Sequence, residues 1–218
     1  MQKTNNLKLW LTVIYVGCLM IGNTVAAKQI QLPLGLTATG AAVLVPITYI
    51  LSDVFSEVYG YKWSRTSCYM AFALNLIMVT AYQLCIWAPH PDYFQNQAAF
   101  QLILGNAPRV LAGSSLGLLV GDFVNDKVFQ IMKRNHAHEH KGFAGRSIFS
   151  SVLGEIADTS VFVPIAFGGL MSIPDAVVLG ASGVFLKLLC EVVLFPATNI
   201  ACKKIKKAEG VDEFAKKG

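Results

Sequence analysis

Runs of about twenty mostly apolar residues recur along this chain of 218 residues, and they constrain its fold more than any other feature. A run of that length can cross the hydrocarbon core of a bilayer, roughly 30 Å thick, as a single α-helix. Six segments qualify: residues 8–30, 38–60, 65–88, 102–132, 147–172 and 176–202. The sequence therefore predicts an all-α integral membrane protein, a single domain of six transmembrane helices followed by a basic tail at 203–218.

The composition excludes two other classes of protein. Hydrophobic residues make up 54% of the chain and charged residues only 14%, against roughly 25% charged residues in a typical soluble domain, so the chain is not intrinsically disordered. Its five cysteines are unclustered and lie among apolar residues, which argues against a secreted disulfide scaffold. The first run follows Lys3 and Lys8 as in a signal peptide, but it is long enough to span a membrane, and we expect it to be retained.

Lysine and arginine are distributed in alternate loops. They occur in the amino terminus, the turn near 60–66, the loop 133–146 and the tail 203–218, whereas the segments 88–97 and 168–176 contain none. Because cytoplasmic loops carry the basic residues of membrane proteins, we expect both termini to be cytoplasmic. The net charge of +5 is therefore a topology signal, and no basic-aromatic motif points to nucleic acid.

Two prolines suggest internal symmetry. Pro46 lies inside the second span and Pro164 inside the fifth, at matching positions if the chain consists of two three-span halves. Paired helix breaks of this kind occur in transporters built from inverted repeats, so a 3+3 repeat is a hypothesis for this chain.

Ionisable side chains inside membrane spans are energetically costly, and they mark functional sites by default. This chain has nine of them: Asp53 and Glu57 in the second span, Arg109, Asp122 and Asp126 in the fourth, Glu155 and Asp158 in the fifth, and Lys187 and Glu191 in the sixth. Side chains three or four residues apart share one face of a helix. Since Asp158 and Lys187 also lie near the middle of their spans, we expect charged groups from several helices to surround one cavity.

Two interpretations of these charges remain open. Lys187 could simply neutralise Glu191 on its own helix or Asp158 across the bundle, because unpaired charges are not tolerated in lipid. The same groups could also form a polar binding site, and we favour this because helices that only need to adhere can use small residues. Uncharged amides and aromatic rings could contribute as well, or could serve packing alone: Asn23, Asn75, Gln83, Tyr49, Phe55, Tyr59, Phe162 and Phe167.

Motifs of common enzymes are missing. The sequence contains no HExxH, GxSxG or P-loop pattern, so we expect no enzymatic activity, no cofactor and no ATP hydrolysis by this chain. His136, His138 and His140 could hold a metal ion, but the loop around them is basic, which favours a solvated loop.

Five stretches carry a resemblance to a known family: GNTVAAK (22–28), PITYILSDVFSEVYGYKWSR (46–65), APRVLAGSS (107–115), SSVLGEIADTSVF (150–162) and FLKLLCEVVLFP (185–196). They are similar to the queuosine-precursor transporters, also called the vitamin uptake transporter family. Members are bacterial six-span inner-membrane proteins that import 7-cyano-7-deazaguanine. The most specific parts are the second-span motif, in which an aspartate precedes ExYG, and the fifth-span element.

The resemblance implies a substrate and the residues that bind it. The polar positions of the family fall on Asn23, Asp53, Glu57, Arg109, Glu155, Asp158 and Lys187. A deazaguanine presents an N–H and an amino group that a carboxylate can accept together, and a carbonyl that a cation or amide can donate to. Asp158 or Glu155 would suit the first role, and Lys187 or Asn23 the second.

Three functions are compatible with these residues. We favour an importer, either a secondary transporter or a facilitator, whose partners are the deazapurine and the bilayer; a homodimer is compatible with the sequence. A substrate-capturing subunit that docks on an energising module is the second hypothesis. A membrane-embedded enzyme that uses the buried carboxylates is the third.

Overall fold

The computed structural model describes residues 6–135 and 143–209. Its helices are α1 (Asn6–Val25), α2 (Val45–Val54), α3 (Tyr61–Trp87), α4 (Gln97–Leu104), α5 (Ala107–Asn135), α6 (Phe143–Phe167) and α7 (Ile173–Glu209). Short elements join them: β1 (Gln29–Gln31), η1 (Pro33–Gly35), β2 (Thr37–Thr39) and η2 (Gly40–Val43) before α2, and the π-helical turn η3 (Phe55–Tyr59) after it. Within the described ranges, five stretches are long and apolar enough to cross a membrane: α1, α3, the α4–α5 run, α6 and α7.

The predicted second span, residues 38–60, is not one continuous helix. It consists of the end of β2, then η2, the ten-residue helix α2 and the turn η3. Pro46 lies in the first turn of α2, where proline begins a helix, whereas Pro164 lies inside α6. The two prolines do not hold equivalent places, so the 3+3 repeat stays a prediction. Because residues 38–60 do not form one helix, the count of six transmembrane helices also stays a prediction.

The structure is mostly helical, as predicted, and a small β-hairpin is an addition that the sequence did not predict. Strands β1 and β2 pair antiparallel with Ile30 opposite Ala38, and Leu34 and Gly35 at the tip both have positive φ angles. The hairpin contacts α7, because the Thr37 amide donates to Ser182 Oγ at 3.2 Å. Irregular backbone is tolerated at membrane depth only where its polar groups have partners, and the pairing of β1 with β2 supplies them along the inner edge of each strand.

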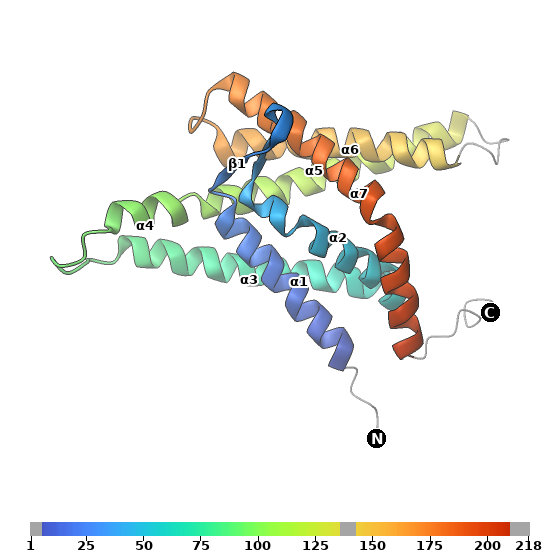
Figure 1. Cartoon of the computed structure of the whole chain (residues 1–218), viewed down its shortest axis with the longest axis horizontal. Helices are drawn as coiled ribbons and strands as arrows, with labels where there is room; N and C mark the ends of the chain where they lie inside the picture. The colour runs from blue at the N-terminus through green and yellow to red at the C-terminus, as the bar shows by residue number, and fades with distance from the viewer. Residues whose placement is uncertain (1–5, 136–142, 210–218) are drawn as a thin grey trace.

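Two predicted boundaries also change. The fourth span begins as the separate helix α4, and Gly105 and Asn106 separate α4 from α5. The sixth helix is longer than expected, because α7 continues to Glu209 and includes the first seven residues of the segment predicted as a basic tail. Figure 1 shows that α7 changes direction along its length, and Pro196 inside it removes one backbone hydrogen bond.

The long helices give the molecule two distinct ends. In Figure 1, α3, α5 and α6 run along the longest axis. The 88–96 loop lies at one end, and the start of α3 and the end of α5 lie at the other. We call the end with the start of α3 the basic end, because Lys62 and Arg65 lie there. The end with the 88–96 loop is the base-free end, because this loop contains no lysine or arginine.

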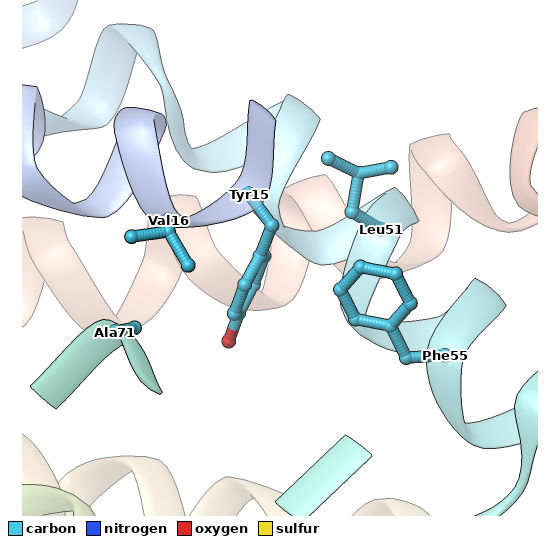
Figure 2. Packing of buried hydrophobic residues seen from close by; sticks show 5 residues of the cluster. All are labelled: Tyr15, Val16, Leu51, Phe55 and Ala71. Atoms are coloured by element: carbon cyan, nitrogen blue, oxygen red, sulfur yellow. The ribbon is translucent and has the colours of Figure 1, made fainter. Parts of the chain in front are cut away.

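A buried cluster holds the short helix α2 in place. Tyr15 and Val16 of α1, Leu51 of α2, Phe55 of η3 and Ala71 of α3 pack together (Figure 2). The rings of Tyr15 and Phe55 meet edge to face, with their centroids 5.3 Å apart. Because α2 has only ten residues, this packing is what fixes the direction of its polar side chains.

Candidate functional site

A cavity of about 410 Å³ lies between α2, α5, α6 and α7. It is lined by Tyr49, Ser52, Asp53, Leu118, Gly121, Asp122, Asn125, Ser151, Gly154, Glu155, Asp158, Glu191, Leu194 and Thr198. On α5 and α6 these residues run from the middle of each helix toward the basic end. The volume falls in the range of roughly 300–1,000 Å³ that is typical of small-molecule sites.

Lys187 of α7 joins two carboxylates of α6. Its ammonium donates to Glu155 Oε2 at 2.7 Å and also to Asp158 Oδ2. The three side chains keep 31%, 24% and 19% of their surface exposed, so the cluster is partly buried, and its two carboxylates line the cavity. The predicted pairing of Lys187 with Asp158 across the bundle is therefore confirmed, with Glu155 as a second partner.

Tyr49 extends this cluster to α2. Its hydroxyl donates to Glu155 Oε1 at 3.4 Å, so both oxygens of that carboxylate accept a hydrogen bond. The packing around Leu51 and Phe55 holds α2 and thereby aims Tyr49 at the cavity. A phenol ring beside two carboxylates offers a planar ligand one aromatic face.

The cavity carries an excess of negative charge. Five carboxylates line it, those of Asp53, Asp122, Glu155, Asp158 and Glu191. Lys187 neutralises part of this charge, and in the described part of the chain Asp53, Asp122 and Glu191 form no salt bridge. The site can therefore accept several hydrogen bonds from a ligand and attracts positive charge.

Glu57 is separated from the cavity. It lies in η3, four residues beyond Asp53 and hence about 6 Å further toward the basic end. Lys206 of α7 donates to Glu57 Oε1 at 2.6 Å. The structure thus places Asp53 on the cavity wall and Glu57 in a contact between η3 and the last turns of α7.

Asn23 also has a local partner away from the cavity. Its amide donates to Asn75 Oδ1 at 2.6 Å, and Asn75 in turn donates to the Ala71 carbonyl at 2.9 Å. The amide pair links α1 to α3 and explains how both side chains are satisfied inside the bundle.

Arg109 binds the end of a neighbouring helix. Its guanidinium donates from Nε to the Ile165 carbonyl at 3.0 Å and from Nη2 to the Gly168 carbonyl at 2.7 Å. These carbonyls lie at the carboxyl end of α6, where a cation also complements the helix dipole. Arg109 does not line the cavity, so its position favours a structural role.

Arg109→Met is expected to lower the stability of the protein by about 1.5–3 kcal/mol, because hydrogen bonds from a charged donor to carbonyls are lost together. Thermal unfolding of the detergent-purified protein measures this loss. Arg65→Met is the matched control, since Arg65 is exposed and, among the described residues, its side chain donates to Tyr61 on its own helix. An equal loss in the two variants would contradict the assignment of Arg109.

Among the remaining predicted residues, the phenylalanines serve packing, Tyr59 donates to Glu209 Oε1 at 2.9 Å, and the three histidines lie outside the described ranges. Phe55 belongs to the α1–α2–α3 cluster, and Phe162 and Phe167 pack edge to face with centroids 5.7 Å apart. The segment with His136, His138 and His140 lies outside the described residues, so the prediction of a solvated loop stays untested.

Several lining residues were not among the predicted site residues. Asp122 and Glu191 were noted as ionisable residues within spans, and Glu191 follows Lys187 by one helical turn, which was the signal for its shared face. Asn125, Ser151 and Thr198 gave no such signal, because uncharged polar residues are common throughout the chain.

Comparison with known proteins agrees with the motifs. The protein-family model described as "Putative vitamin uptake transporter" matches residues 39–201, a range that contains every residue of the cavity wall. The chain is also similar to the "Probable queuosine precursor transporter" of Bacillus subtilis (strain 168), with 24% identity over 187 residues covering 86% of this chain and 81% of the relative. No solved structure matches the chain.

Proposed function

The chain belongs to the vitamin uptake transporter family, as its motifs predicted, and on that premise we propose that it imports the queuosine precursor 7-cyano-7-deazaguanine across the bacterial inner membrane. The name of the Bacillus relative supports a queuosine precursor as the substrate class. The observation that carries the proposal is the ammonium of Lys187 held between two carboxylates on the wall of a cavity of suitable size.

The chemistry of the cluster matches the edge of a deazaguanine. The ring N–H and the exocyclic amine are two neighbouring donors, and the Lys187 ammonium now donates to Glu155 and Asp158 in the same way. A ligand edge can therefore replace the ammonium at the two carboxylates. Lys187, once displaced, can donate to the ring carbonyl next to that edge.

This exchange gives a route for coupling binding to movement. The bridge from Lys187 to Glu155 and Asp158 ties α7 to α6 while the site is empty. A ligand that replaces Lys187 at the two carboxylates removes this direct contact between α6 and α7 and forms contacts of its own in the cavity. A ligand that binds another arrangement of α6 and α7 more tightly than this one shifts the conformational equilibrium toward it.

Uptake of labelled 7-cyano-7-deazaguanine into cells unable to synthesise it tests the proposal. Cells that express this chain alone are expected to accumulate the label, and cells that express Asp158→Asn are not. Binding without accumulation would instead identify a substrate-capturing subunit. Chemical conversion of the ligand by purified protein would identify an enzyme, and absence of binding would overturn the substrate.

The excess of carboxylates predicts a preference among analogues. A deazaguanine whose nitrile is replaced by an aminomethyl group carries a positive charge at neutral pH, which Asp53, Asp122 and Glu191 can attract. We expect it to bind about 1–2 kcal/mol more tightly, roughly ten-fold in Kd, than the cyano compound. Competition binding on purified protein measures this, and the neutral N-acetyl derivative is the control. Equal affinity of the charged and acetylated compounds would show that the extra carboxylates do not act on the ligand.

The topology is tested by labelling single cysteines. With both termini cytoplasmic, an impermeant thiol reagent added to intact cells is expected to label Gln95→Cys in the 88–96 loop and to leave Lys62→Cys unlabelled. Both positions are exposed, and the five native cysteines, of which Cys85 is exposed, are first replaced. Labelling at residue 62 but not at residue 95 would reverse the orientation.

A further inference from the structure

Helices α5 and α6 lie side by side because small residues let their backbones approach closely (Figure 1). Gly113, Gly117 and Gly121 are spaced four residues apart on α5 and all face α6. A Cβ atom at Gly113 would lie 3.1 Å from the Phe162 carbonyl, and one at Gly121 would lie 2.9 Å from Asp158 Cβ. The interface is therefore tight along its length.

Gly117 differs from its neighbours in what occupies the space beside it. A Cβ atom there would overlap Oδ1 of the Asp158 carboxylate and would lie 2.8 Å from the Asp158 main-chain oxygen. The carboxylate oxygen thus fills the volume that a side chain on Gly117 would need. The second oxygen, Oδ2, accepts from Lys187 on α7.

We propose that Gly117 is a positioning residue for the Asp158 carboxylate. Its missing side chain forms a notch in α5 that receives one carboxylate oxygen, and this leaves the other oxygen directed at Lys187 and the cavity. An alanine in this place must turn the carboxylate about its Cα–Cβ bond and must also move the α6 backbone away from α5, because its Cβ would lie too close to the Asp158 main-chain oxygen. Together these changes take Oδ2 away from Lys187, so the ion pair and the ligand acceptor are lost together.

The first measurement needs no ligand. Thermal stability of Lys187→Met, Asp158→Asn and their combination gives a non-additive shift in Tm that reports the coupling of the two residues. We expect a non-additivity of about 5 °C in the native protein and close to none with Gly117→Ala. Gly113→Ala is the matched control, because it crowds the same helix pair without touching Asp158, and Gly183→Ala controls for the added methyl group in open space.

The second measurement rests on the proposed function. The Kd of 7-cyano-7-deazaguanine is expected to rise at least about ten-fold in Gly117→Ala, and less than about three-fold in the two control variants, since one acceptor group is displaced. If the coupling vanishes in Gly117→Ala while even the native protein binds no ligand, the positioning role stands and the proposed substrate fails.

A further variant covers the case in which Gly117→Ala does not fold. Asp158→Glu keeps the charge but moves the carboxylate out of the notch by one methylene group, and we expect it to lose the coupling to Lys187. Retained coupling in Asp158→Glu would overturn the proposal. So would a Gly117→Ala protein that is less stable but has the native coupling between Lys187 and Asp158, because Gly117 would then serve helix packing alone.

Discussion

Asp158→Asn is expected to abolish detectable binding of 7-cyano-7-deazaguanine, with a loss of roughly 30- to 1,000-fold in affinity. An ionised acceptor that bonds a ligand donor in a partly dry site contributes on the order of 2–4 kcal/mol. Asparagine keeps the shape of the side chain but replaces one oxygen with a donor, which opposes the amino edge of the ligand. Equilibrium binding to purified protein measures the effect directly.

An analogue without the 2-amino group separates recognition from folding. It is expected to bind the native protein much more weakly than the parent compound, and the two ligands should differ far less in Asp158→Asn. Asp92→Asn is the matched control, because Asp92 is exposed in the 88–96 loop and lies outside the cavity wall. An equal loss for both ligands would mean that Asp158 supports the fold or the transport cycle. Retained affinity in Asp158→Asn and Glu155→Gln would move the acceptor to Asp53 or the other lining carboxylates.

The depth of the charged residues could be predicted from the sequence, but their direction could not. Asp158 and Lys187 lie near the centres of their spans, and a buried cation needs a carboxylate at the same depth, so their pairing followed. Arg109 and Asn23 satisfied the same criterion of polarity within a span. Both have partners on adjacent helices away from the cavity, and only the packing of the bundle determines which way they point.

The break in the second span could not be predicted from the sequence for a different reason. Residues 38–60 are apolar enough to be read as one span, and hydropathy does not distinguish a strand end, a 3-10 turn and a short helix from one long helix. Pro33 and Gly35 at the hairpin tip were the available turn signals. The consequence for function is large, because α2 is short and its polar residues Tyr49 and Asp53 face the cavity as part of a non-continuous span.

Lys187→Met is expected to destabilise the protein more than a single change at any carboxylate that lines the cavity. Its removal leaves Glu155 and Asp158, which now share one ammonium, as two carboxylates on one helix face without their cation. Stranding a buried partner of an ion pair costs roughly 3–5 kcal/mol. Since these side chains keep between 19% and 31% of their surface exposed, we expect the lower part of that range, a fall in Tm on the order of 6–12 °C.

Removing the stranded charges should restore stability in steps. The double variant Lys187→Met with Asp158→Asn is expected to be more stable than Lys187→Met alone, and the further change Glu155→Gln should add to the recovery, because each step removes one uncompensated carboxylate. Thermal unfolding in detergent at neutral pH measures the series. Lys204→Met, an exposed lysine on the same helix, is the control for loss of a positive charge and should shift Tm little. If the losses from Lys187→Met and Asp158→Asn simply add, the ion pair contributes no coupling. The same series separates a role in stability from a role in ligand recognition. The triple variant is expected to fold with restored stability. If it then binds no ligand, the loss of binding is due to recognition and assigns that role to these three residues.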